Sequence, residues 1–118
     1  MARILSVSYD PTLLSTRHMI LEAHGYQVVS AEGFTDSIEK CKSGKYDLLI
    51  MGHSIPHKDK EAIVRELNAH CPAPVLALLR IGEPRLAEAT ESIDSFDPKP
   101  VLAAVERILA SSKRTIAD

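Results

Sequence analysis

The sequence lacks the features that mark several classes of protein. Its 118 residues carry a formal net charge of −2, so it has none of the basic excess that is typical of nucleic-acid binding. No apolar run approaches the ~20 residues of a membrane-spanning helix. The start, Met1-Ala2-Arg3, leads into the short run 4–7 and not into the h-region of a signal peptide. We therefore expect a cytoplasmic protein that binds neither nucleic acid nor a membrane.

Cysteine and glycine are also scarce. The two cysteines, Cys41 and Cys71, lie far apart and in no metal-ligand spacing. We expect them to be reduced thiols in or near the core. None of the five glycines belongs to a Gly-rich phosphate loop. The sequence therefore predicts no metal site and no cofactor.

What is present is ordinary for a globular protein. Hydrophobic residues make up 45% of the chain and charged residues 25%, which is enough to build a core. No low-complexity linker or internal repeat divides the chain. We expect a single domain over residues 1–118.

Short apolar runs alternate with helical patterns along the whole chain. The run 48–51, which follows Tyr46-Asp47, is apolar without alternation, and this is typical of a strand buried on both faces of a parallel sheet. Strands are predicted at 3–7, 26–31, 48–51, 75–79 and 93–96, with helices that begin at Pro11, Thr35, Asp59, Gly82 and Pro98. This alternation predicts an α/β fold with helices on both faces of a doubly wound parallel sheet.

Local signals define some of the helix ends. Asp10 followed by Pro11 predicts an N-cap and the first helical position. Gly25 is expected to end that helix in the left-handed conformation. Asp59 is expected to cap the third helix, and Pro98-Lys99-Pro100 to end the fifth strand and start the last helix.

Several segments together resemble the response-regulator receiver domain. They are 4–7 before Asp10-Pro11, Gly25-Tyr26-Gln27-Val28-Val29 with Ala31, the strand 46–51, Pro56 followed by Asp59, Pro74 with 75–78, and Phe96 ahead of Lys99-Pro100. The resemblance covers nearly the whole chain. It implies a flavodoxin-like (βα)5 fold with strand order 2-1-3-4-5 and a role in two-component or phosphorelay signalling.

The residues that carry the family's chemistry are mostly replaced. The family phosphorylates an aspartate at the end of the third strand, where this chain has Gly52. It holds Mg²⁺ with two acidic residues at the end of the first strand, where this chain has Ser8 and Tyr9. The switch Ser/Thr after the fourth strand corresponds to Leu79, and the lysine after the fifth strand is matched to Lys99. Without a carboxylate nucleophile and carboxylate ligands, phosphoryl transfer through Mg²⁺ loses its main parts.

We do not expect another carboxylate to restore this chemistry. Asp47 lies roughly 16 Å away at the other end of the strand, and Asp10 is better explained as an N-cap. His53 adjoins the missing acceptor and could be phosphorylated or bind a metal. Pro56 separates it from His57, so a helical metal pair is not expected. By resemblance, a cis bond before Pro100 is plausible.

The leading hypothesis is a pseudo-receiver, a receiver-fold protein that binds other proteins without being switched by aspartyl phosphorylation. By resemblance, its contact surface is the face of the fourth helix, fifth strand and fifth helix, which would bind a histidine kinase or another regulator, or a second copy of the chain. Candidate residues there are Arg85, Glu88, Glu91, Phe96, Arg107 and Lys113. The same charges also fit an ordinary solvated helix face.

The residues also allow two other hypotheses of function. A small-molecule or anion binder would use the crevice at the strand ends, with polar contacts from Ser8, Tyr9, His53 and Lys99 and a close backbone approach at Gly52. A hydrolase would need Ser8, His53 and Asp10 as nucleophile, base and orienting residue. The nucleophile-elbow motif is absent, so we expect that the protein is not an enzyme.

Overall fold

The computed structural model describes the backbone of residues 1–117 and the side chains of residues 1–111. Five strands and four helices follow one another along these residues. In order they are β1 (Arg3–Ser8), α1 (Pro11–Ala23), β2 (Gln27–Glu32), α2 (Gly33–Lys42), β3 (Leu48–Met51), α3 (His57–His70), β4 (Val75–Leu78), β5 (Glu91–Ile93) and α4 (Pro98–Ala117). Among the described residues, no helix is long and apolar enough to cross a membrane.

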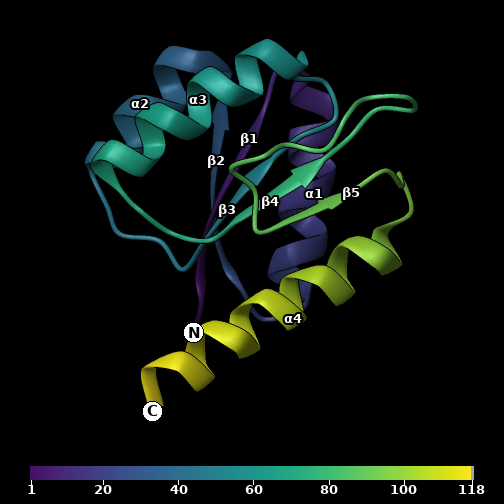
Figure 1. Cartoon of the computed structure of the whole chain (residues 1–118). Coiled ribbons are helices and arrows are strands. Elements are labelled where there is room, and N and C mark those ends of the chain that lie inside the picture. Colours follow the sequence, from purple (N-terminus) through teal and green to yellow (C-terminus); the bar gives the residue numbers. More distant parts are fainter. Residues whose placement is uncertain (118) are drawn as a thin grey trace.

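All strand pairs are parallel and form one sheet of order β2-β1-β3-β4-β5 (Figure 1). The register places Val7 opposite Met51, so β1 and β3 end side by side. The predicted order and the doubly wound architecture are confirmed. Ligands of such sheets bind where neighbouring strands end, so a site is expected at the ends of β1, β3 and β4.

The sheet lies between two layers of helices (Figure 1). One core cluster joins Leu5, Val7, Leu49 and Met51 to α2 and α3, and the other joins Ile4, Leu48, Ile50, Leu76 and Leu78 to α1 and α4. Every residue of β3 and β4 is buried, as expected for central strands covered on both faces. The predicted buried strand at 48–51 is confirmed.

The first helix has the predicted ends, but the third does not. Asp10 accepts hydrogen bonds through Oδ1 from the backbone N–H groups of Thr12 and Leu13, at 2.8 and 3.2 Å, and Gly25 has a φ of 89°. The third helix begins at His57 after Pro56. Asp59 is therefore in its first turn and not its N-cap, because Pro56 with its extended ψ of 149° already marks the start.

The segment between β4 and β5 is not the predicted helix. Residues 79–90 form an irregular loop with a turn at Gly82, whose φ is 82°. The Glu83 carboxylate bonds the backbone N–H of Arg80 and the ammonium of Lys60. The side chain of Glu83 thus ties the loop down to the sheet, and the chain reaches β5 without a helical turn.

The fifth strand begins earlier than predicted, whereas the last helix begins at the predicted residue. β5 spans Glu91–Ile93 and not 93–96. The last helix begins at Pro98, so Lys99 lies in its first turn, where its backbone N–H bonds Oδ1 of Asp97. No peptide bond in the described part of the chain is cis, so the suggested cis bond before Pro100 is wrong. A proline suits the first turn of a helix in the trans form, because its missing N–H would be unpaired there anyway.

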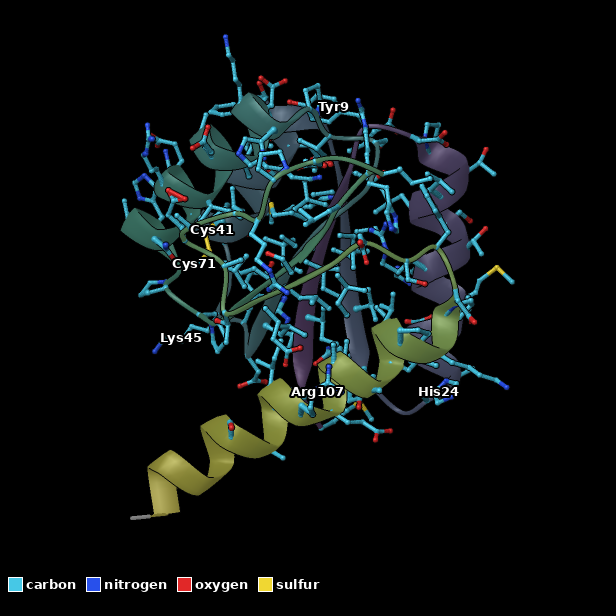
Figure 2. All side chains as sticks on the ribbon, turned by 45° about the vertical axis from the view of Figure 1, so that its right-hand side comes forward. Tyr9, His24, Cys41, Lys45, Cys71 and Arg107 are labelled. Atoms are coloured by element: carbon cyan, nitrogen blue, oxygen red, sulfur yellow. A yellow bond between two sulfur atoms is a disulfide. The ribbon has the colours of Figure 1, made fainter. Side chains whose placement is uncertain are left out.

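The two cysteines form a disulfide. Cys41 of α2 and Cys71, which follows α3, are joined across 30 residues of sequence with their Cα atoms 5.6 Å apart (Figure 2). The expectation of reduced thiols is wrong for this structure. The pairing depends on α2 and α3 packing side by side on the same face of the sheet, and sequence spacing alone does not reveal this.

Candidate functional site

The ends of β1 and β3 are joined by a compact hydroxyl network. Oγ of Ser54 accepts hydrogen bonds from the backbone N–H groups of Tyr9 and Asp10, at 2.9 and 3.1 Å, and lies 2.8 Å from Oγ of Ser8. With both backbone donors directed at Ser54, its own proton can go to Ser8. The network uses the polar groups that would otherwise face a ligand. Ser54 was not predicted as a site residue, since a lone serine in a loop carries no sequence signal.

Tyr9 and Asp10 are engaged elsewhere. The Tyr9 hydroxyl donates to Oδ2 of Asp59 at 2.9 Å. Burial and this hydrogen bond raise the pKa of Tyr9 to about 12, so the phenol remains neutral. The Asp10 carboxylate caps α1, and the Asp47 carboxylate bonds the backbone N–H of Arg3 at the opposite end of the sheet. None of these oxygens points to a shared metal position.

A buried arginine lies beside the glycine at the end of β3. Arg17 of α1 is only 9% exposed, and its Nη1 donates to Oγ of Ser6 at 3.0 Å. A Cβ atom added at Gly52 would lie 2.9 Å from Nη2 of Arg17 and 2.9 Å from the carbonyl oxygen of Val7. The missing side chain at Gly52 therefore leaves room for the guanidinium. Where a working receiver has a carboxylate, this chain has a cation.

A second buried cation holds the loop that follows β4. Lys60 is fully buried, and its ammonium bonds the Leu78 carbonyl at 2.8 Å and both carboxylate oxygens of Glu83 at 2.7 and 2.9 Å. Nδ1 of His57 lies 3.0 Å from the same carboxylate. Burial raises the pKa of Glu83, but its hydrogen bonds from Lys60, the Arg80 N–H and His57 outweigh this and leave the pKa below its ordinary value. The carboxylate is therefore ionised and paired.

Arg80 fixes the same loop to the segment after β3. Its Nε donates to the carbonyl of His53 at 2.8 Å, and its Nη2 donates to the carbonyl of Ser54 at 2.7 Å. Leu79, matched to the family's switch hydroxyl, is buried at 4% exposure and offers no polar group. The two loops that flank the strand ends are thus joined by fixed contacts.

Lys99 lies in the first turn of α4, and its side chain is exposed. The residue that directly follows β5 is Asp94, which is also exposed. Lys99 comes after the fifth strand in the chain, as predicted, but Pro98 already starts the helix between them. The match of Lys99 to the family's lysine stays a prediction.

His53 is enclosed and does not face the other predicted site residues. It is 7% exposed, its Nε2 donates to the carbonyl of Ser95 at 2.8 Å, and its ring stacks on Phe96 with centroids 4.2 Å apart. Burial lowers its pKa. Ser8 bonds Ser54 and the Asp10 carbonyl, so the suggested arrangement of Ser8, His53 and Asp10 is not assembled.

The predicted interaction residues belong to β5, α4 and the segments beside them, and they differ in exposure. Phe96 is 60% exposed despite its stack on His53. Arg107 of α4 pairs with Glu91 of β5, with Nη2 2.8 Å from Oε1 (the labelled Arg107 is on the near side in Figure 2). Arg85 is exposed and Glu88 half-buried on the 79–90 loop. The Lys113 side chain lies outside the described residues. Since the predicted fourth helix is absent, this surface consists of a loop, β5 and α4.

The donor set at the strand ends does not fit Mg²⁺. This hard cation is bound by carboxylate and similar oxygens, whereas the region offers two mutually bonded serine hydroxyls and the Arg17 guanidinium. No group of three or more potential metal-binding His, Cys, Asp or Glu side chains occurs within the described part of the chain. The buried positive charge of Arg17 further opposes a cation at this place. Gly52 itself has no side chain that could accept a phosphoryl group.

Comparisons with known proteins agree with the architecture. No model of a protein family matches the chain. The transcriptional regulatory protein ResD of Bacillus subtilis is 23% identical over 120 residues, which cover 96% of this chain and 50% of ResD. The chain thus spans about half the length of the curated relative it matches.

Solved structures give a closer likeness. A CheY-like response-regulator receiver domain protein from Methanospirillum hungatei superposes with a TM-score of 0.84 at 20% identity and covers 98% of both chains. The structure of the histidine kinase ThkA in complex with the response regulator TrrA from Thermotoga maritima gives a TM-score of 0.77 at 25% identity, over 92% of this chain and 99% of the other. The parallel sheet order seen here is that of the same fold. The chain therefore has the fold of a CheY-like response-regulator receiver domain.

Proposed function

We propose that this protein is a pseudo-receiver, a phosphorylation-independent interaction module of a two-component or phosphorelay system. The observation that carries the proposal is the guanidinium of Arg17 beside Gly52, in the place where the fold would present an acceptor carboxylate. The hydroxyl network of Ser8 and Ser54 and the fixed loop of Arg80 support it. A receiver fold that lacks the acceptor carboxylate and the metal-binding carboxylates can still bind other proteins through its surface. The proposed location is the cytoplasm.

The proposed partner is a histidine kinase or another regulator of the same pathway. The likeness to a response regulator seen in complex with a histidine kinase supports this class of partner. The proposed contact surface is the part of the molecule formed by Phe96, Arg107, Arg85 and Glu88, and a second copy of the chain is another candidate for it. The exposed Phe96 ring gives this surface an apolar centre.

The alternative of an anion binder at the strand ends has less support. Ser8 and Tyr9 are occupied by internal hydrogen bonds. Lys99 is exposed in the first turn of α4, and His53 lines a cavity together with Arg17. The four residues suggested for this function therefore do not converge on one ligand.

The proposed surface predicts a specific loss of binding. Replacing Phe96 and Arg107 with alanine should weaken binding to a purified partner kinase domain by about tenfold or more, because exposed aromatic and arginine side chains dominate such contacts. Binding should be measured by calorimetry with and without Mg²⁺ and acetyl phosphate. The matched control is Arg65→Ala on the opposite layer. Unchanged affinity in the double variant would refute the surface, and a phosphodonor-dependent affinity would refute phosphorylation independence.

Restoring the acceptor alone should not restore phosphorylation. In Gly52→Asp the new carboxylate would pair with Arg17, and its Cβ would press on the Val7 carbonyl. We expect no acyl phosphate after incubation with acetyl phosphate and Mg²⁺, as measured by intact mass. Amide NMR peaks of the wild type near Ser8 and Gly52 should likewise not move with Mg²⁺ and beryllofluoride.

The control for the metal is Gly52→Asp combined with Ser8→Asp and Tyr9→Asp, tested with and without Arg17→Gln. Phosphate should be incorporated only in the variant that has all three new aspartates and in which Arg17→Gln removes the guanidinium. Phosphate incorporation by the single Gly52→Asp variant would show that this account of the site is wrong.

A further inference from the structure

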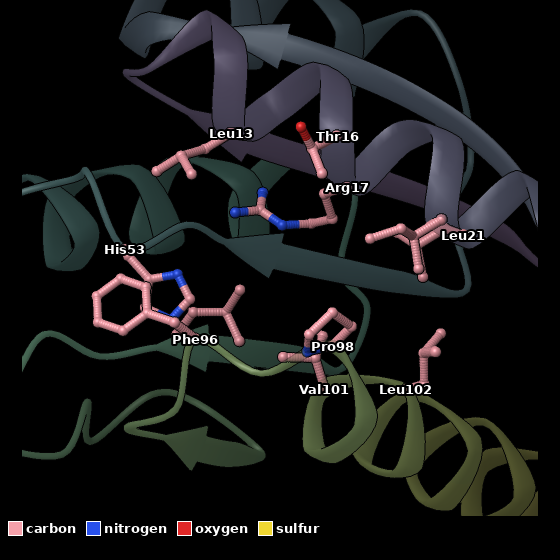
Figure 3. Close-up of a pocket in the computed structure, with 11 residues that line it drawn as sticks. Leu13, Thr16, Arg17, Leu21, His53, Phe96, Pro98, Val101 and Leu102 are labelled. Atoms are coloured by element: carbon pink, nitrogen blue, oxygen red, sulfur yellow. The ribbon is translucent and has the colours of Figure 1, made fainter.

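A cavity of about 110 Å³ lies between α1 and α4, next to the end of β3 (Figure 3). Its walls are mostly apolar and come from both helices, through Leu13, Ile20, Leu21, Val101 and Leu102. The stacked His53 and Phe96 form one end. This cavity is distinct from the region of Ser8 and Ser54, neither of which lines it.

Arg17 supplies the charge in this cavity. Figure 3 shows its guanidinium directed into the space between the helices, toward His53. No carboxylate lines the cavity, and no described residue forms an ion pair with Arg17. Burial lowers the pKa of Arg17 to about 10, so the group is still charged near neutral pH.

The hydrogen bonds of Arg17 are incomplete. A guanidinium has five N–H donors in a planar fork, and within the described side chains its one hydrogen bond goes to Oγ of Ser6. A buried charge without a counter-ion is costly, and Arg17 is nine-tenths buried. By contrast, the other buried cation, Lys60, has a carboxylate partner in Glu83. The cavity beside Arg17 is where a counter-ion from outside the chain would fit.

The shape and lining define the kind of anion. The cavity is smaller than the ~150 Å³ space that takes a benzene molecule, so the ligand has about three to five carbon atoms. A fully polar anion such as phosphate would leave most of its oxygens against leucine and valine side chains. A carboxylate with a short apolar tail matches both the Arg17 guanidinium and the apolar walls, since Arg forms planar, paired hydrogen bonds with carboxylates.

We propose that the cavity between α1 and α4 binds a small aliphatic monocarboxylate, whose carboxylate pairs with Arg17 and whose tail packs against the leucine and valine side chains. The site is independent of the proposed kinase binding. Phe96 lines the cavity and also belongs to the proposed interaction surface. A bound ligand would therefore pack against the Phe96 ring and hold it in place.

The test uses sodium butyrate with the full chain. Amide NMR and calorimetry should show saturable binding, with peaks moving at Thr16, Arg17 and Val101. Butyramide has the same shape, but its amide lacks the negative charge and the second acceptor oxygen that a carboxylate offers to Arg17. It should therefore bind at least about tenfold more weakly. Inorganic phosphate should not move the same peaks.

Variants separate the cavity from nonspecific effects of the anion. Arg17→Met keeps the length of the side chain and should lower butyrate affinity by about tenfold or more, whereas Arg65→Met at an exposed position of α3 should leave it unchanged. If Arg17→Met does not fold, the comparison of butyrate with butyramide on the wild type still decides. Absence of butyrate binding, equal binding of butyramide, or equal binding of phosphate would each overturn the proposal.

Discussion

Lys60→Met should lower the free energy of unfolding by about 3–5 kcal/mol, the typical cost of removing one partner of a buried ion pair. The ammonium of Lys60 is fully enclosed and makes three hydrogen bonds, two of them to Glu83. Without it, the Glu83 carboxylate, only 6% exposed in its side chain, would be left inside the protein without its main counter-ion. This is a large fraction of the ~5–15 kcal/mol that stabilises a typical domain.

Urea unfolding gives the measurement, and a second lysine of α3 gives the control. Lys58→Met removes the same charge from an exposed position two residues earlier and should change stability by less than about 0.5 kcal/mol. The loss of unfolding free energy in Lys60→Met combined with Glu83→Gln should be smaller than the sum of the losses in the two single variants, because the unpaired Glu83 charge is removed as well. A loss below about 1 kcal/mol in Lys60→Met would contradict this role of the pair.

The contribution of Glu83 should depend on pH. Because its folded pKa lies below the ordinary value of 4.5, the stability it provides is fully present above pH 4.5 and is lost as the pH falls through the folded pKa. The difference in stability between the wild type and Glu83→Gln should therefore shrink in acid. A constant difference between pH 7 and pH 3 would mean that the ion pair does not hold the loop.

The sheet could be predicted because its signals are local. The unbroken apolar run 48–51 reveals a strand covered on both faces, and Asp10 followed by Pro11 marks a helix start within three residues. Gly25, which follows α1, adopts the positive φ predicted for the end of that helix. Such features depend on neighbours in sequence and leave little room for a competing arrangement.

The buried cations could not be predicted in the same way. Lysine and arginine are almost never fully buried unless they are paired, and the partner of Lys60 lies 23 residues away on a loop. A signal was present, since Lys60 stands on the same helix face as the buried Ile63 and Leu67, and Arg17 stands between the buried Leu14 and Leu21. A cation within an apolar helical stripe indicates a buried charge whose partner remains to be found.

The surroundings of Lys99 depend on where β5 ends and α4 begins. The sequence Pro98-Lys99-Pro100 fits a lysine–proline pair after a strand, and it fits the first turn of a helix equally well. In the structure Asp97 accepts the backbone N–H of Lys99, which places the helix start ahead of the lysine. The hydrogen bond at the helix start, and not the pair of residue types, decides between the two.

Removing the disulfide should be the other large loss of stability. The bridge joins Cys41 and Cys71 across a sequence separation of 30 residues. In the loop-entropy treatment, such a bridge raises the free energy of the unfolded chain by about 3–4 kcal/mol. It joins the end of α2 to the end of α3 and encloses β3 in its loop. Cys41→Ala with Cys71→Ala should therefore lower the urea midpoint by roughly 1–3 M.

The redox state of the protein gives the matched control. A reductant should lower the midpoint of the wild type toward that of the double variant and should leave the variant itself unchanged. Intact mass before and after alkylation reports how much of the wild type is bridged.

In a reducing cytoplasm, thiols are usually kept free, so the protein there would have the stability of the reduced form. Two alkylatable thiols in protein purified without reductant, with no change of midpoint on adding one, would show that the bridge does not form. The fold would then depend on the packing of α2 against α3 alone.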